Sequence, residues 1–323
     1  MKVCVVGAGA IGGLVASGFA RAGHEVCLVA RGAHLDALRA KGLTLISGDK
    51  REVFALRASD EPADLGAQEV VFLCLKTPSI AAMLPRLKPL VARDTVVVPA
   101  INGLPWWYFY KEGGKLDGQT VACLDPEGTL FRALDPRHVL GCVVHAAAQV
   151  LEPGVVRHTA GREFLIGEPD RSRSARAERM VAAMNAAGFQ AKLAVDIRVE
   201  IWLKLTGNLS YNPVAALALA HMDDIHGNPG LLALVRSLIE ETMRVAQAYG
   251  VRVPITVDER IAIAKKLAGA KISMHQDIER RRPLEVDAIV GAVVELARKA
   301  GIATPMTDAI YALVAERAKH LDR

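Results

Sequence analysis

The sequence has few aromatic residues and lacks any long uninterrupted apolar run. Aromatic residues make up 5% of the 323 positions, while alanine, valine and leucine dominate. This composition favours parallel sheets and packed helices over an all-β fold. No segment reaches the roughly 18 consecutive apolar residues of a membrane-spanning helix. Four glycines (Gly7, Gly9, Gly12 and Gly13) interrupt the apolar run after Lys2, which argues against a signal peptide. We therefore expect a cytoplasmic protein with no membrane association.

Paired cysteines are also missing. The five cysteines are odd in number and never have the CxxC spacing. Most lie in apolar, β-like runs, so we interpret them as small buried hydrophobic residues in a reducing compartment. No zinc pattern occurs, and we predict no metal site. These cysteines are Cys4, Cys27, Cys74, Cys123 and Cys142.

The chain has no concentrated run of basic residues. Its formal net charge is +5, and arginines cluster only briefly at 171–176 and 280–282. Neither cluster is interleaved with aromatic residues, as surfaces that bind nucleic acids usually are. We expect no nucleic-acid partner. The modest positive excess favours an anionic small ligand.

The first thirty residues contain a glycine-rich motif in a specific setting. A β-rich run at 2–6 leads directly into the motif, and a helix at 14–22 and a second strand at 25–29 follow. The first glycine of such a motif makes a tight turn, the second lets the backbone approach a pyrophosphate, and the third lets helix pack on strand. In this setting the motif predicts a dinucleotide-binding βαβ unit. It consists of Gly7, Ala8, Gly9, Ala10, Ile11 and Gly12.

The end of the second strand indicates which dinucleotide binds. Enzymes that use NAD usually have an acidic residue there to hold the ribose 2′-hydroxyl. This chain instead has Arg31, whose guanidinium suits a 2′-phosphate. We predict NADP(H) as cofactor. The alternative is that Arg31 is only a surface arginine in a loop.

Further strands of the N-terminal half bring two polar residues to the expected ligand edge. Lys76 and Asn102 follow predicted strands at 70–75 and 95–99, and ligands of open α/β sheets bind outside the carboxyl ends of strands. Lys76 could meet a cofactor phosphate or a substrate carboxylate, and Asn102 could face the nicotinamide. Alternatively they are a helix-start lysine and an Asn-Gly turn.

Other β-like runs occur at 43–46, 53–56, 121–123, 141–145, 155–159 and 164–166. Glu152-Pro153-Gly154 predicts a hairpin that adds antiparallel strands to the sheet.

An aromatic run at 106–110 stands out in a chain with so few aromatic residues. It directly follows Asn102 at the expected cleft. It could wall off a substrate pocket, form a subunit contact or pack in the core.

The pattern changes from strands to helices near residue 195. A polar linker at 168–174 precedes an amphipathic helix at 175–187 and a last strand at 189–195. From Asp196 onward all periodicity is helical. We predict an α/β fold with two domains: a Rossmann-type, doubly wound NADP-binding domain at 1–195 and an all-helical substrate and catalytic domain at 196–323. The predicted helices are 197–211, 213–219, 230–249, 254–267, 284–300 and 305–320.

One helix of this second domain has a polar stripe on an otherwise apolar element. Lys204, Asn208 and Asn212 are four residues apart, so they lie above one another on one helical face. We expect Pro213 to end or kink the helix. A buried lysine beside two amides is a candidate proton donor. The alternative is that Lys204 extends to water while the asparagines cap or cross-link helices.

A second polar cluster lies further along the chain. Ser273 and Asp277 lie on one side of the basic stretch 279–282, and Glu285 lies on the other. A hydroxyl and a carboxylate from this cluster could complete a site that Lys204 begins. Taken alone, the pattern is more typical of a helix cap and a solvated charge cluster.

Together these motifs resemble those of the ketopantoate reductases (2-dehydropantoate 2-reductases), and the resemblance covers essentially the whole chain. The motifs are GAGAIGG, Arg31, LCLKTP, INGLP, VHAA, W-x-K-L-x-x-N-x-x-x-N-P, SMHQD and LEVD. The resemblance implies a Rossmann domain and a helical domain with the active site between them. It also implies NADPH-dependent reduction of a 2-oxo acid to a 2-hydroxy acid in pantothenate and coenzyme A synthesis. We further expect a homodimer.

The resemblance also implies roles for single residues. Lys204 corresponds to the catalytic lysine that protonates the substrate oxygen, and Glu285 to an acid near the cofactor and the lysine. Asn208 and Asn212 correspond to substrate-binding amides, and Ser273 to the hydroxyl that binds the substrate carboxylate. The implied cofactor contacts are Arg31, Lys76, Asn102, which is also close to substrate, and Ala147.

Several positions depart from the family pattern. Leu284 stands where threonine is usual, Arg280 where glycine is common, and Val290 in place of an asparagine. Met222 falls where some members have another substrate asparagine, and the aromatic run at 106–110 is not a general feature. These departures concern the substrate pocket more than the proton and hydride chemistry. Two alternatives therefore stay open: a related reductase of a different 2-oxo acid, and a non-catalytic NADPH-binding sensor.

Overall fold

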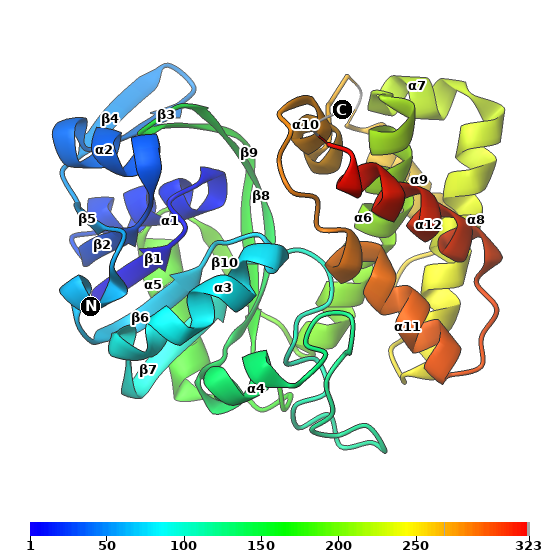
Figure 1. The fold of residues 1–323 in the computed structure, drawn as a ribbon, viewed down its shortest axis with the longest axis horizontal. Coiled ribbons are helices and arrows are strands. Elements are labelled where there is room, and N and C mark those ends of the chain that lie inside the picture. Colours follow the sequence, from blue (N-terminus) through cyan, green and yellow to red (C-terminus); the bar gives the residue numbers. More distant parts are fainter. Residues whose placement is uncertain (268, 322–323) are drawn as a thin grey trace.

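The computed structural model describes residues 1–267 and 269–321, and it places sheets and helices in two adjacent parts. In Figure 1 the two sheets and their helices occupy one side, and the helices of the C-terminal part occupy the other. The predicted fold class is confirmed: the N-terminal part is a Rossmann-type α/β structure and the C-terminal part is helical. The boundary between residues 195 and 196 stays a prediction. No helix within the described ranges is long and apolar enough to cross a membrane.

The first sheet is entirely parallel, with the strand order β5-β2-β1-β6-β7. Four of the five residues of β1 and of β2 are buried, as expected for strands covered on both faces. The parallel register places the carboxyl ends of these strands along one edge, where ligands of such sheets bind. The elements are β1 (Lys2–Val6), β2 (Glu25–Val29), β5 (Arg57–Ser59), β6 (Gln68–Leu73) and β7 (Val91–Pro99), with α1 (Ala10–Arg21), α2 (Gly32–Lys41), η1 (Pro62–Leu65), α3 (Thr77–Leu87) and η2 (Lys88–Leu90).

A second sheet packs on the other side of α1. Its order is β10-β9-β3-β4, and β8 pairs antiparallel with β9. The predicted hairpin at Glu152-Pro153-Gly154 joins β8 to β9, with Gly154 at a φ of +79°. The expectation that these strands extend the first sheet is wrong, because α1 contacts β1 and β2 as well as β8 and β9 and so separates the sheets. The strands are β3 (Leu43–Ser47), β4 (Lys50–Phe54), β8 (Gly141–Glu152), β9 (Val155–Gly167) and β10 (Gln190–Leu193).

The segment 121–123 is a turn, so the prediction of β structure there is wrong. The backbone N–H groups of Ala122 and Cys123 each donate to the Glu295 carboxylate at 2.8 Å. Hydrogen bonds to one side chain of the helical part thus replace those of a strand. Nearby lie α4 (Thr129–Ala133) and η3 (Pro136–His138).

Helix α6 (Ile197–Ala218) lies at the centre of the helical part and contacts α8, α9, α10 and α12. It continues through Pro213, so the predicted pair of helices is one helix. Of the end or kink expected at Pro213, the end is wrong. Proline inside a helix costs about 3 kcal/mol. Fifteen residues of α6 are buried, and we attribute its continuity to this packing. The other elements are α5 (Ala175–Ala186), α7 (Met222–Gly227), α8 (Pro229–Ala248), α9 (Val257–Lys265), α10 (Ser273–Glu279), the π-helix η4 (Asp287–Gly291), α11 (Ala292–Lys299) and α12 (Pro305–Lys319).

The aromatic run is part of the core and holds the start of α6. Trp106 to Phe109 are each 2% exposed or less, which rules out a subunit contact through these side chains. Trp202 of α6 donates from Nε1 to the Tyr108 hydroxyl at 2.7 Å. The buried guanidinium of Arg198 donates to the carbonyl oxygens of Tyr108 at 2.9 Å, Tyr110 at 2.8 Å and Pro169. The run therefore fixes the start of α6 against the N-terminal part.

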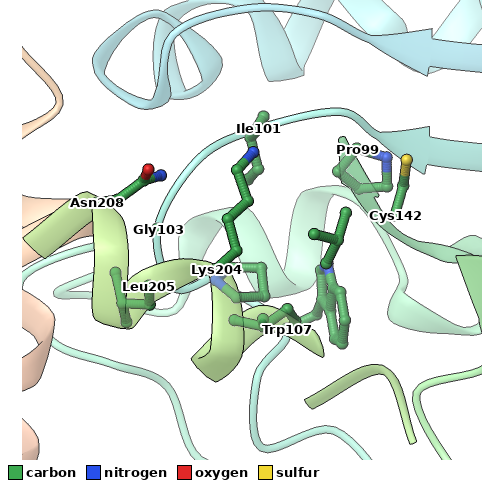
Figure 2. A pocket seen from close by; sticks show the side chains of 11 residues that line it. Pro99, Ile101, Gly103, Trp107, Cys142, Lys204, Leu205 and Asn208 are labelled. Atoms are coloured by element: carbon green, nitrogen blue, oxygen red, sulfur yellow. The ribbon is translucent and has the colours of Figure 1, made fainter. Parts of the chain in front are cut away.

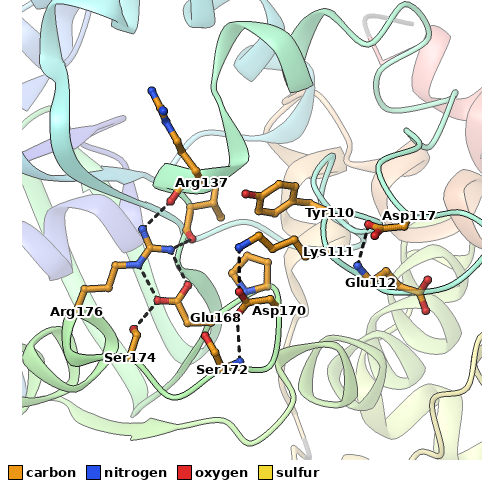
Figure 3. A network of polar contacts seen from close by, with 12 residues as sticks. Tyr110, Lys111, Glu112, Asp117, Arg137, Glu168, Asp170, Ser172, Ser174 and Arg176 are labelled. Carbon is orange, nitrogen blue, oxygen red and sulfur yellow. Dashed lines mark hydrogen bonds and ion pairs between the residues drawn. The ribbon is translucent and has the colours of Figure 1, made fainter.

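The polar linker at 168–174 is also held in place. Figure 3 shows the Arg176 guanidinium directed at the Glu168 carboxylate, with a closest N–O distance of 2.6 Å. Glu168 is almost fully buried, and Arg176 also donates to the carbonyl oxygens of Arg137 and Val139. These bonds secure the chain where it passes from β9 to α5.

Candidate active site

The glycine-rich loop leads into the amino end of α1 and leaves open space there at Gly9. Gly7 has a φ of +95°, and a Cβ there would lie 2.7 Å from the Cys74 carbonyl oxygen. A Cβ on Gly12 would lie 2.0 Å from the Gly7 oxygen, whereas one on Gly9 would meet nothing within 4 Å. The first and third glycines thus permit close packing, and the second leaves open space. With no acidic residue in the first turn of α1, this helix start suits a phosphate group.

A histidine that the sequence analysis did not single out holds this loop. The ring of His34, on α2, contacts the Ala8 carbonyl oxygen through Nε2 at 2.7 Å. Its Nδ1 accepts from the Gly154 N–H at 3.1 Å, so the tautomer with a proton on Nε2 satisfies both contacts. His34 therefore ties the glycine-rich loop to the hairpin of the second sheet.

Arg31 lies at the carboxyl end of β2, where it is the N-cap residue of α2. Its side chain is exposed and has no ion pair or hydrogen bond to any residue of 1–267 or 269–321. The guanidinium is thus available to an anionic group of a ligand bound along this edge.

A chain of hydrogen bonds crosses from α6 to the sheet edge. The Lys204 Nζ donates to Asn102 Oδ1 at 2.8 Å, and Asn102 Nδ2 donates to Glu285 Oε2 at 3.0 Å. The other Glu285 oxygen accepts from the Thr77 N–H at 3.4 Å. Residues of three separate segments therefore fix the position of the Lys204 ammonium group. Two candidate catalytic residues and one candidate ligand-binding residue meet here.

The surroundings of Lys204 change its acidity. Burial lowers the pKa of Lys204 to about 8, against the opposing effects of Cys142 and Glu285. Burial also raises the pKa of Glu285, while the hydrogen bond from Asn102 and the charge of Lys76 oppose this change. An ammonium group with a pKa of about 8 keeps its proton at pH 7 and releases it more readily than an ordinary lysine. The arrangement is suited to proton donation near neutral pH.

Lys76 joins the two parts of the molecule. It is the N-cap residue of α3, yet its Nζ donates to the Pro283 carbonyl oxygen at 2.8 Å and pairs with Asp277 at 2.5 Å. Asp277 and Glu285 are therefore not members of a solvated charge cluster, because their carboxylates face residues of the N-terminal part. Folding of the helical part against the sheet edge gives them these partners.

A pocket opens beside Lys204. In Figure 2 the Lys204 side chain extends from α6 toward the loop after β7, and Asn208 lies on the same helix. The pocket wall combines these two polar groups with apolar surface. Its lining includes Pro99, Ile101, Trp107, Cys142 and Leu205. Of the residues in the aromatic run, Trp107 is the one that lines this pocket.

The remaining predicted residues lie apart from this hydrogen-bonded chain. Asn212 is buried further along α6, and its Nδ2 has no hydrogen-bond partner in the described residues. Ser273 is exposed in the first turn of α10, which packs against α6. Its hydroxyl is not a helix cap, since Ile272 occupies the N-cap position without a side-chain bond. Ala147 is exposed on β8.

Two departures from the family pattern lie in the core. Met222 is 1% exposed and Leu284 is 5% exposed. Both side chains pack in the apolar core that α6 and α8 share.

Sequence reasoning also missed Arg260, which lies over Gly207 beside the polar stripe of α6. The one local signal was a glycine inside the helix next to Asn208. A glycine in a helix interior often marks close approach of another group.

A glycine-rich loop on a parallel sheet, an exposed arginine at the next strand end and a partly buried lysine facing the sheet edge are the features of a dinucleotide-dependent oxidoreductase. The family model for ketopantoate reductase PanE/ApbA matches residues 3–171. The model for the C-terminal part of the same family matches residues 196–318. The chain belongs to this family of oxidoreductases.

Individual relatives agree with this assignment. A 2-dehydropantoate 2-reductase of Mesorhizobium japonicum is 44% identical over 97% of each chain. A crystal structure from Ralstonia solanacearum MolK2 is 36% identical, with a TM-score of 0.95 over 99% of this chain and 98% of that one. D-mandelate dehydrogenase, solved with NADH and anilino(oxo)acetate, has a TM-score of 0.87 over the full length of both chains. At 21% identity it shows a common fold only.

Proposed function

We propose that this protein reduces 2-dehydropantoate (ketopantoate) to pantoate with NADPH, a step of pantothenate and coenzyme A synthesis. The observation that supports this most strongly is the Lys204–Asn102–Glu285 chain after β7, at the same edge of the sheet as the glycine-rich loop. The relative at 44% identity, named a 2-dehydropantoate 2-reductase, supports the choice of substrate.

In this proposal the cofactor lies along the carboxyl edge of the first sheet. The strand order puts Arg31 at β2, the glycine-rich loop at β1, Lys76 after β6 and Asn102 after β7. Arg31 holds the 2′-phosphate, and the N–H groups at the start of α1 hold the pyrophosphate. Bound NADPH would supply the hydride, and its nicotinamide end would lie toward Asn102 and Lys204.

Lys204 acts as the proton donor. Its ammonium group binds the C2 carbonyl oxygen of the 2-oxo acid, polarises the carbonyl and then protonates the oxygen. Asn102 fixes the direction of the ammonium group, and Glu285 fixes the Asn102 amide. Asn208, Asn212 and Ser273 are proposed to hold the rest of the substrate, and Ala147 to contact the cofactor.

The test is an NADPH-oxidation assay with ketopantoate and a panel of other 2-oxo acids. We expect the highest kcat/KM for ketopantoate. A higher value for another acid would favour the paralogue, which is supported by apolar Met222 and Leu284 at positions where the family has polar residues. NADPH binding without oxidation by any 2-oxo acid would favour the sensor. The homodimer stays a prediction, and sedimentation measurements would test it.

A further inference from the structure

A close approach between two helices explains the glycine in the middle of α6. Glycine in a helix interior is unfavourable relative to alanine. At position 207 an added Cβ would lie 2.1 Å from Nη2 of Arg260 and 2.7 Å from its Cζ. Arg260 belongs to α9. Its guanidinium lies against α6 at Gly207, where the missing Cβ leaves room for it.

This guanidinium has no acceptor within the described part of the chain. Its Nε is buried without a hydrogen-bond partner, and no ion pair to Arg260 occurs among residues 1–267 and 269–321. Burial lowers its pKa, against the weaker opposing effect of Tyr211. The buried guanidinium of Arg198, by contrast, donates hydrogen bonds to three carbonyl oxygens. Partly buried charges without partners are costly, so unused donors at Arg260 indicate an anion that is bound during function.

Arg260 lies on the same side of α6 as the proposed proton donor. Positions 204, 207, 208 and 211 are neighbours on one helical face. Burial, then Lys204 and more weakly Arg260, lower the pKa of His145 on β8 to about 4, whereas Glu163 opposes them. An ammonium, an amide and the guanidinium over Gly207 therefore lie along one face of α6.

We propose that Arg260 binds the substrate carboxylate in addition to the Ser273 hydroxyl, while Lys204 binds the adjacent carbonyl oxygen, and that Arg260 thereby selects 2-oxo acids over uncharged carbonyl compounds. A planar guanidinium can bind both carboxylate oxygens, which sets the orientation of the substrate. The inference rests on the proposed function and adds a specificity-determining residue to that site. It also explains why α6 has a glycine at position 207.

The first test compares Arg260→Gln with Arg252→Gln, an exposed arginine just before α9. Each variant is assayed with ketopantoate, its methyl ester and NADPH. For Arg260→Gln we expect a KM for the acid ~10–100-fold higher, as for a lost charge-assisted hydrogen bond, with little change in kcat. The KM values for the ester and for NADPH should stay unchanged, and Arg252→Gln should match wild type. An equal loss for acid and ester, or no change for the acid, would overturn the proposal.

A second variant covers the case in which Arg260→Gln does not fold. Gly207→Ala keeps the charge and favours the helix, but its Cβ displaces the guanidinium. We expect the same selective rise in KM for the acid. If Gly207→Ala leaves that KM unchanged, Arg260 is not the carboxylate site.

Binding of oxamate, an unreactive mimic of a 2-oxo acid, separates this inference from the proposed function. Calorimetry of the NADP⁺ complex should show oxamate binding that weakens ~10–100-fold in Arg260→Gln. If no 2-oxo acid is reduced but oxamate binding depends on Arg260, the proposed reaction fails and the anion site stands. If ketopantoate is reduced and Arg260→Gln binds oxamate as tightly as wild type, only the inference about Arg260 fails.

Discussion

The Lys204 ammonium group donates a 2.8 Å hydrogen bond to Asn102, a residue 102 positions earlier in the chain. This bond joins the central helix of the C-terminal part to the loop after β7. Asn102 also donates to Glu285, which lies in a second segment of the helical part. The direction of the Lys204 side chain is therefore fixed from both parts of the molecule.

Removal of the proposed proton donor should slow catalysis strongly. For Lys204→Ala we expect kcat to fall by ~10²–10⁴, the usual contribution of a positioned general acid. Affinity for NADPH should stay near wild type, because the proposed phosphate contacts lie at the strand ends of the N-terminal part and not on α6. The measurements are steady-state NADPH oxidation and NADPH titration by fluorescence. Turnover at the wild-type rate would exclude Lys204 as the donor.

The pH dependence of the reaction should report the lysine. Reduction needs the ammonium form, whose pKa burial lowers to about 8, so kcat/KM should be constant below that pH and fall above it. Oxidation of the hydroxy acid needs the neutral amine and should rise through the same pH.

Glu285→Gln provides a control for this assignment. The Glu285 carboxylate raises the pKa of Lys204, so its removal should move the alkaline limb to lower pH. A limb that does not move would assign the titration to a different group.

Cofactor choice should depend on Arg31. We expect Arg31→Ala to weaken NADPH binding ~10–100-fold, because a charge-assisted hydrogen bond to the 2′-phosphate is lost. NADH, which has no such phosphate, should bind as before. Arg93→Ala is the matched control, since Arg93 is an exposed arginine near the amino end of β7. Equal losses for both cofactors would mean that Arg31 does not bind the phosphate.

Stability should depend on the buried guanidinium that holds α6. Arg198→Ala leaves the carbonyl oxygens of Tyr108, Tyr110 and Pro169 without this donor. We expect the free energy of unfolding to fall by about 3 kcal/mol, measured by urea denaturation with circular dichroism. Arg298→Ala, which removes an ion pair of a mostly exposed side chain, should change it little. Similar losses in the two variants would contradict the special role of Arg198.

Some sequence-based expectations were wrong for identifiable reasons. The end of a helix at Pro213 follows from local propensity, but α6 has neighbours on several sides and continues to Ala218. The residues at 121–123 have a β-rich composition, yet their N–H groups bind Glu295 from α11. In both places contacts with distant segments outweigh the local preference.

The sequence by itself determined the glycine-rich loop and the face of α6 that presents Lys204 and Asn208. Both follow from contiguous residues, because glycine spacing sets the backbone turn and helical period sets the face. Only the tertiary structure decided that Asn102 and Glu285 direct the lysine, that Asp277 pairs with Lys76, and that Arg260 rests on Gly207. These partners lie far apart in the chain, and no periodic pattern encodes which of many charged side chains meet when the helical part packs against the sheet edge.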